Sequence, residues 1–108
     1  MGRSLKYEIP GVDRRCDSLE LAERGFDGLF AAALEDASRR VLEIGFGRGE
    51  FLLELAAKQP ETAFLGVEIS FKRVLKMARK VGRAELCNVR LMEAKGEVVL
   101  HDLLPNGL

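Results

Sequence analysis

Three short apolar runs alternate with segments of helical apolar spacing through the later part of this 108-residue chain. The runs at 40–44, 63–69 and 88–92 have the length and composition of strands. Helices are expected over 49–58, from the N-cap Ser70 to about position 82, and over 96–104. Because strands and helices alternate with short connections, the pattern predicts an α/β fold with a parallel sheet in the strand order 3-2-1.

The N-terminal part, 1–38, lacks this alternation. A capping box that begins at Asp17 predicts a short helix that ends at Gly25, and a second helix is expected over 27–34. We therefore expect an N-terminal arm and helical lead-in over 1–38, followed by a Rossmann-like half-domain over 39–108.

The first predicted strand, 40–44, would be central in a doubly wound fold, with a fourth strand beside it. No such strand is predicted after the helical segment 96–104. The fold is therefore expected to be truncated after about three parallel strands. Its first strand would have an exposed edge, and a homodimer through that edge is one expected assembly.

The composition, 47% hydrophobic and 31% charged, is typical of a soluble globular protein, and no apolar run approaches the ~18 residues of a membrane span. The two cysteines, Cys16 and Cys87, are far apart, without a Cys/His cluster. This pattern favours a reducing compartment, the cytoplasm, and argues against a zinc site. His101 is the only histidine, so we expect neither a histidine-based metal centre nor a Ser-His-Asp triad.

The net charge is zero, but the two signs are separated along the chain. Segment 17–36 holds six acidic residues and one basic residue, whereas 72–83 holds six basic residues and no acidic one. The six bases are Lys72, Arg73, Lys76, Arg79, Lys80 and Arg83. They could contact RNA phosphates, or they could form the solvated face of an amphipathic helix, which is the commoner meaning of such a run. No aromatic residue is interleaved to stack on bases.

Glycines alternate at positions 45, 47 and 49, between the first predicted strand and its helix. A glycine loop at the start of a helix lets a small ligand lie against bare backbone. A P-loop is excluded, because Gly49 is followed by Glu50 and not by lysine. A dinucleotide loop would need its third glycine at position 50, where Glu50 instead would repel a pyrophosphate.

Two acidic residues flank this loop, Glu43 before it and Glu68 at the end of the next predicted strand. A carboxylate at the second position can accept both hydroxyl hydrogen bonds of a ribose diol, and one that enters the loop suits a cationic ligand. S-adenosylmethionine has an ammonium group, a sulfonium and a ribose diol but no phosphate, so the pattern favours this cofactor. The alternative is that both acids lie at strand ends on a solvated surface.

A resemblance to the S-adenosylmethionine-binding half of tRNA (guanine-N7)-methyltransferases rests on three runs: LEIGFGRGEFLLELA (42–56), FLGVEIS (64–70) and NVRLM (88–92). The resemblance covers 41–108 and implies a Rossmann-like class I methyltransferase fold. It implies that Glu43 and the loop hold the methionine end, that Glu68 holds the ribose, and that Ile69 packs near the adenine. The site residues expected on this basis are Glu43, Gly45, Phe46, Gly47, Gly49, Glu68, Ile69 and Glu93.

The chain departs from this family in two places. The family usually has an acidic residue beside the adenine, where ungapped alignment places Lys95; Glu93 is the expected substitute, with Glu97 nearby. The family's catalytic Pro-Asp-Pro-Trp type motif has no counterpart here, so the catalytic residues are expected beyond Leu108. The resemblance thus implies an enzyme that methylates tRNA. This chain would contain only its cofactor-binding half and is expected to be inactive alone. The alternative is a non-catalytic nucleotide-binding or assembly module of Rossmann-like fold.

Overall fold

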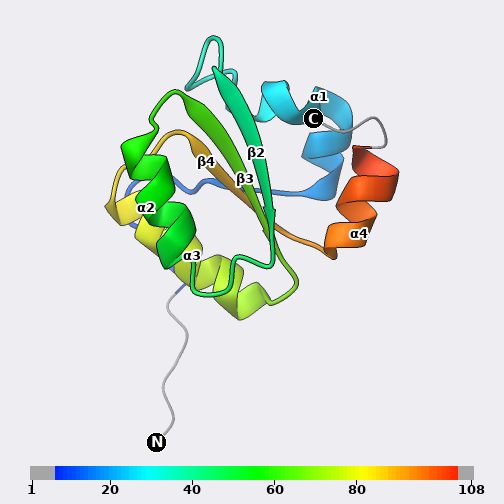
Figure 1. Ribbon diagram of the computed structural model, residues 1–108. Coiled ribbons are helices and arrows are strands. Elements are labelled where there is room, and N and C mark those ends of the chain that lie inside the picture. Colours follow the sequence, from blue (N-terminus) through cyan, green and yellow to red (C-terminus); the bar gives the residue numbers. More distant parts are fainter. Residues whose placement is uncertain (1–6, 105–108) are drawn as a thin grey trace, which may run out of the picture.

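Four parallel strands form a single sheet in the computed structural model, which describes residues 7–104 (Figure 1). Their order is β1-β4-β3-β2. The strands are β1 (Arg15–Cys16), β2 (Arg39–Ile44), β3 (Thr62–Glu68) and β4 (Val89–Glu93). The predicted order 3-2-1 is confirmed for the three longer strands. The predicted number of three is wrong, because β1 has only two residues and is too short for an apolar period to reveal.

The register of the sheet brings the carboxyl ends of the longer strands to one edge. Ile44 of β2 lies opposite Val67 of β3, and Glu68 lies opposite Glu93 of β4. Since the strands are parallel, the loops that follow them gather at this edge, where ligands bind in open α/β sheets.

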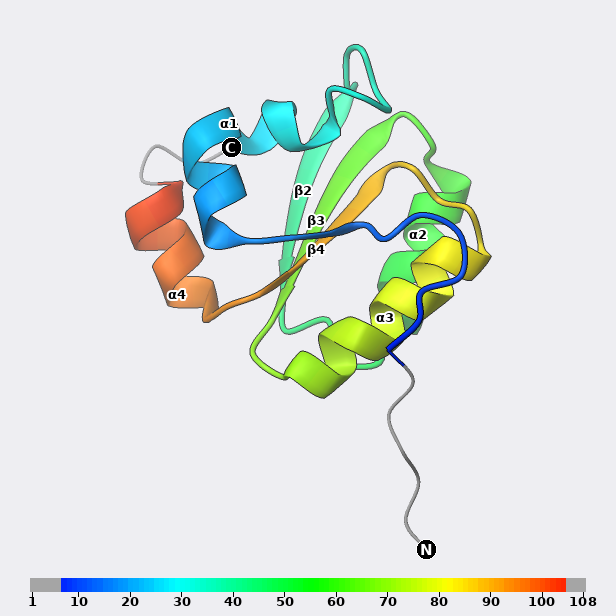
Figure 2. The ribbon, with the colours of Figure 1, turned by 180° about the vertical axis from the view of Figure 1, so that it is seen from behind.

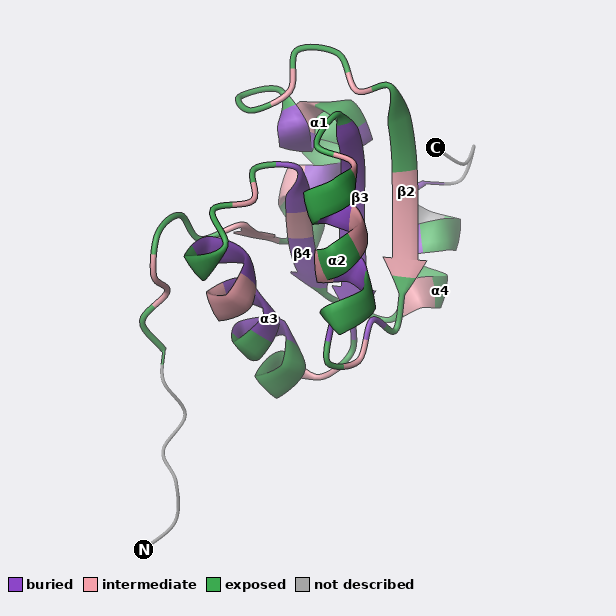
Figure 3. Ribbon diagram, turned by 60° about the vertical axis from the view of Figure 1, so that its left-hand side comes forward, coloured by how far each residue is buried: buried purple, intermediate pink, exposed green. Residues whose placement is uncertain are grey.

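Helices cover both faces of the sheet (Figures 1 and 2). One face carries α2 (Glu50–Lys58) and α3 (Phe71–Arg83); the other carries α1 (Ser18–Phe30), α4 (Gly96–Val98) and the π-helical turn η1 (Val99–Leu103) that continues it. Side chains alternate along β3, so that Phe64 packs toward α2 and α3 while Leu65 and Val67 pack toward α1. All of β3 is buried, whereas β2 is half-buried or exposed (Figure 3).

Asp17 is the N-cap of α1, because its carboxylate accepts a hydrogen bond from the Glu20 backbone N–H at 2.8 Å, which confirms the predicted start of this helix. Gly25, at φ 72° and ψ 173°, interrupts the helix, so that α1 consists of two helical segments joined by a kink at this residue. The predicted break at Gly25 is therefore confirmed, whereas the predicted extension to position 34 is wrong, because α1 ends at Phe30. The buried Phe26 and Phe30 explain why the helix resumes after the kink, since they pack into the core under the sheet.

Arg90 of β4 attaches the N-terminal segment to the sheet. Its guanidinium donates hydrogen bonds to the backbone oxygen of Leu29 at 2.6 Å, to that of Arg14 at 3.1 Å and to the Glu20 carboxylate at 3.2 Å. Residues of β1 and α1 thus share the sheet and core of the later residues. A domain boundary at position 38 stays a prediction.

Within residues 7–104, no helix combines the length and apolar character needed to cross a bilayer. The same residues contain no group of three or more His, Cys, Asp or Glu side chains placed to hold a metal ion.

Candidate functional site

A cavity of about 490 Å³ opens where β2 and β3 end and α4 begins. Its walls combine apolar and charged side chains from three loops at the carboxyl edge of the sheet. They come from Ile44, Gly45, Val67, Glu68, Ile69, Ala94, Lys95, Gly96, Glu97, Leu100 and His101. We call it the sheet-edge cavity.

The loop after β2 needs its glycines for two different reasons. Gly45, Gly47 and Gly49 have φ of 72°, 61° and 84°, a region that side-chain-bearing residues rarely adopt. A Cβ atom on Gly45 or Gly47 would meet nothing within 4 Å, whereas one on Gly49 would overlap the Met77 sulfur. The first two glycines therefore leave open space beside the backbone, and the third allows α3 to pack against the loop.

Phe46 anchors this loop to the sheet. Its side chain is 7% exposed and belongs to the core between the sheet, α2 and α3. A Cβ atom on Gly66 of β3 would lie 2.9 Å from the Phe46 ring, so this glycine makes room for the anchor. Only the backbone of Phe46 is thereby available to a ligand.

Glu68 connects the end of β3 to the two segments beside it. Its side chain is 5% exposed; Oε2 accepts a hydrogen bond from the Ser70 N–H at 2.8 Å, and Oε1 accepts one from the Gly47 N–H at 3.4 Å. The guanidinium of Arg73 lies 3.8 Å from Oε1. A carboxylate offers about four lone-pair sites, so two backbone donors leave it able to accept from a ligand.

Exposed apolar side chains face the sheet-edge cavity beside this carboxylate. Ile69 is 65% exposed, Ile44 46% and Leu100 45%. Exposed side chains of this size around a few polar groups are typical of small-molecule sites. The arrangement suits a ligand with a flat ring system and hydroxyl groups.

The structure gathers some of the residues expected from the sequence and separates others. Gly45, Glu68 and Ile69 lie together on the sheet-edge cavity. Glu43 is half-buried within β2 and does not line that cavity. Glu93 lies opposite Glu68 in the register but lines another pocket, with Phe71 and residues of β1 and α1.

Lys95 and Glu97, which flank Gly96, occupy the place in the sheet-edge cavity where the resemblance puts an acidic residue. Sequence reasoning missed that Ile44, Leu100 and His101 would share this cavity, because no spacing along the chain connects them. Gly96 offers the one local signal: its missing side chain lets α4 pack against Ile44, which a Cβ atom would overlap.

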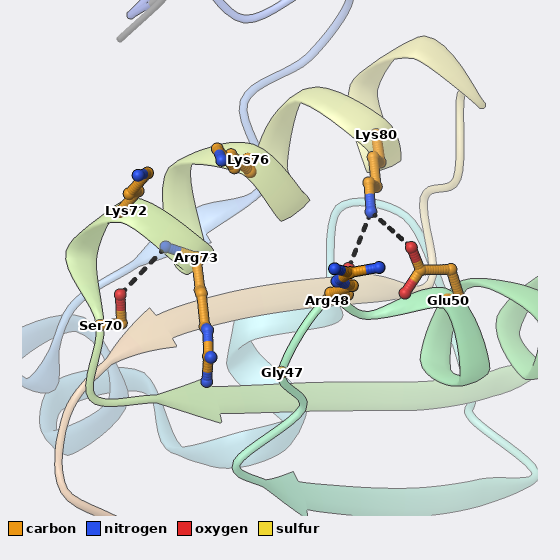
Figure 4. Close-up of a pocket in the computed structure, with 8 residues that line it drawn as sticks. All are labelled: Gly47, Arg48, Glu50, Ser70, Lys72, Arg73, Lys76 and Lys80. Carbon is orange, nitrogen blue, oxygen red and sulfur yellow. Dashed lines mark hydrogen bonds and ion pairs between the residues drawn. The ribbon is translucent and has the colours of Figure 1, made fainter.

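A second cavity, of about 560 Å³, lies on the other side of the glycine loop, against α3. We call it the basic groove. Its lining residues are Gly47, Arg48, Glu50, Ser70, Lys72, Arg73, Lys76 and Lys80 (Figure 4). Four of the six bases singled out in the sequence are among them, whereas Arg79 and Arg83 are not.

Lys80 closes one end of the basic groove. Its ammonium donates hydrogen bonds to the Arg48 backbone oxygen at 2.9 Å and to the Glu50 carboxylate at 3.1 Å, as Figure 4 shows. The hydrogen bond from Lys80 holds the pKa of Glu50 below its ordinary value. Lys80 thus connects the end of the glycine loop to α3. It also pairs with Glu50, the single acidic residue that lines the basic groove.

Comparison of the sequence with models of known protein families shows the family of this chain. The family model described as "Putative methyltransferase" matches residues 37–108, which include the glycine loop, Glu68 and both cavities. The chain belongs to this methyltransferase family.

Curated relatives agree with this assignment. A tRNA (guanine-N(7)-)-methyltransferase of Thermotoga maritima is 46% identical over 66 residues, which are 61% of this chain and 21% of the relative. The protein of the same name from Thermus thermophilus is 45% identical over 67 residues, 62% of this chain and 22% of the relative. That of Chromobacterium violaceum is 37% identical over 107 residues, 97% of this chain and 43% of the relative. The methyltransferase chain thus spans less than half the length of these relatives.

A solved structure, titled "Structure of an antibiotic related Methyltransferase", has a similar fold. It superposes with a TM-score of 0.56 at 21% identity and covers 66% of this chain and 37% of that one. The likeness confirms a Rossmann-like α/β fold.

Proposed function

We propose that this chain is the S-adenosylmethionine-binding part of a tRNA (guanine-N7)-methyltransferase. The observation that carries the proposal is the sheet-edge cavity, where Gly45, the buried carboxylate of Glu68 and the exposed Ile69 meet. The tRNA (guanine-N(7)-)-methyltransferases among the relatives of this chain support tRNA and its guanine as the substrate.

The residues present fit this cofactor. Open space beside Gly45 leaves backbone against which a ligand can lie, and Glu68 can accept hydrogen bonds from a ribose diol. Ile69 and Leu100 offer apolar contacts to an adenine ring. When bound, S-adenosylmethionine supplies the methyl group that is transferred to guanine N7.

The remaining expected residues do not line the sheet-edge cavity, and we propose that they act from beside it. Glu43 and the backbone of Phe46 and Gly47 would orient the methionine end, next to the cavity. Gly49 would act through packing, because its Cα faces Met77. The adenine side is assigned to the segment 94–97, since Glu93 faces a different pocket.

Isothermal titration of S-adenosylmethionine into the 108-residue chain tests the proposal. We expect Glu68→Gln to weaken binding roughly 10- to 100-fold, because a hydrogen bond to a charged group contributes about 1.5–3 kcal/mol. Glu54→Gln is the matched control: Glu54 is an exposed residue of α2 that pairs only with Lys58 among the described residues, and binding should not change.

Two results would contradict the proposal: no binding by the folded wild-type chain, or equal affinity in Glu68→Gln. The absence of binding would favour a non-catalytic nucleotide-binding or assembly module, and equal affinity would show that Glu68 does not hold the ligand. Circular dichroism of each variant shows whether the fold is retained.

The proposal includes tRNA as the partner of the full-length enzyme and the cytoplasm as its location. It also includes self-association through β2, which pairs only with β3 among residues 7–104. In light scattering we expect a dimer that Ile44→Lys weakens and that Leu19→Lys, a change of another exposed apolar residue on α1, leaves intact. A strictly monomeric profile at high concentration would count against a dimer.

A further inference from the structure

We propose that the basic groove binds the phosphodiester backbone of double-stranded RNA and holds it beside the sheet-edge cavity. That the polyanion is RNA rests on the proposed function. The location, the contacting residues and the mode of binding come from the groove itself.

The cations of the groove come from two elements. Arg48 belongs to the glycine loop, whereas Lys72, Arg73 and Lys76 belong to α3. Lys72 and Lys76 are four residues apart and therefore lie one turn apart on the same helical face. Two positive charges at this spacing can contact neighbouring phosphates of one strand.

Most of this positive charge is not neutralised by the protein. Among residues 7–104, Arg48, Lys72 and Lys76 form no salt bridge, and Arg73 has only a long contact, 3.8 Å, with Glu68. Glu50, the one acidic residue that lines the groove, is paired with Lys80. A concave surface with unpaired cations attracts a polyanion and gains affinity from the counterions that binding releases.

The lining also indicates which part of a nucleic acid the groove contacts. Besides its charged side chains, it offers the Ser70 hydroxyl and the backbone of Gly47, and no aromatic ring. Single-stranded nucleic acids are usually held by stacking on aromatic side chains, whereas cations and hydroxyls contact phosphates. The groove therefore favours the backbone of a duplex stem over unpaired bases.

The basic groove and the sheet-edge cavity lie on either side of the glycine loop. Gly47 lines the groove, Gly45 lines the cavity, and Glu68 of the cavity accepts a hydrogen bond from the Gly47 N–H. Arg73 extends from α3 toward the end of β3, as Figure 4 shows, and lies near the same carboxylate. A duplex held in the groove would thus place an adjacent nucleotide at the mouth of the cavity.

Matched pairs of substitutions on α3 test this inference. Lys72→Gln/Lys76→Gln removes two charges inside the groove, and Arg79→Gln/Arg83→Gln removes two charges of the same helix outside it. Binding of a fluorescent 20-base-pair RNA duplex is followed by anisotropy from 50 to 200 mM salt. We expect the groove pair to lose at least about 10-fold in affinity and about two units of salt slope, because each lysine neutralises one phosphate. The control pair should stay within about 2-fold of wild type.

Three results would overturn the inference: equal losses in both pairs, no loss in either pair, or tighter binding of heparin than of RNA at equal charge. S-adenosylmethionine titrations on the same proteins separate this inference from the proposed function. If Lys72→Gln/Lys76→Gln binds the cofactor normally but not the duplex, the result supports the basic groove as the RNA-binding site. A wild-type chain that binds the duplex through Lys72 and Lys76 but not the cofactor refutes only the proposed function.

Discussion

Gly45 and Gly49 share a left-handed backbone, at φ 72° and 84°, but their surroundings differ. Nothing lies within 4 Å of a Cβ atom on Gly45, whereas one on Gly49 would overlap the Met77 side chain. At the scale of single residues, one glycine therefore serves the ligand side of the loop and the other serves the packing of α3. Glycine is thus required at these two positions of one motif for two different physical reasons.

Substitution by alanine separates these causes. We expect Gly45→Ala to lower the free energy of unfolding by about 1 kcal/mol, the cost of the unfavourable φ. Gly49→Ala should cost about 2–4 kcal/mol, because Met77 must also move within a packed core. Urea unfolding followed by circular dichroism measures both, since the chain has no tryptophan. Equal losses would show that Gly49 has no packing role.

Single residues also show where the sequence was informative. The places of Gly45 and Glu68 at the sheet-edge cavity could be predicted because loop chemistry is local and has a fixed spacing, and that of Ile69 followed from the family resemblance. The positions of Leu100 and His101 in the same cavity could not, since they reach it only because β4 ends beside β3. The prediction for Glu93 illustrates the difficulty: its register is opposite Glu68, yet its side chain lines another pocket.

At the scale of elements, the three longer strands and the helices α2 and α3 could be predicted from periodicity. The two-residue strand β1 could not, because its place in the sheet depends on contacts with the distant strand β4. One of these contacts is the hydrogen bond from the Arg90 guanidinium to the Arg15 backbone oxygen, which joins residues 75 positions apart. For α1, the break at Gly25 could be predicted from the local sequence, but its end at Phe30 could not, because the segment after the kink is positioned by its burial under the sheet. Tertiary contacts, not local propensity, thus determine β1 and the end of α1.

Arg90 should therefore be important for the docking of β1 and α1. We expect Arg90→Met to lower the free energy of unfolding by about 2–4 kcal/mol, because it removes several hydrogen bonds to backbone oxygens and leaves the half-buried Glu20 without this partner. Arg83→Met, at an exposed position of α3, should change stability by less than about 0.5 kcal/mol. Urea unfolding of the two variants makes the comparison. A similar, small effect of both would mean that the N-terminal segment is held mainly by its apolar contacts.

At the scale of the whole molecule, the parallel sheet places two unlike cavities on opposite sides of one loop. The sheet-edge cavity combines apolar walls with the carboxylate of Glu68, and the basic groove combines Arg48 with the lysines of α3. The zero net charge of the chain hides this separation. The arrangement suits a small cofactor on one side and a polyanion on the other.

The central claim, that the sheet-edge cavity binds S-adenosylmethionine, is tested most directly by backbone amide NMR spectra of the ¹⁵N-labelled chain during titration with this cofactor. We expect saturable shifts at residues that line or border the cavity: Gly45, Gly47, Ile69 and Gly96. Gly25 and Gly82, which lie outside it, serve as internal controls and should not shift. Spectra that do not change, or shifts confined to residues outside the cavity, would contradict the claim.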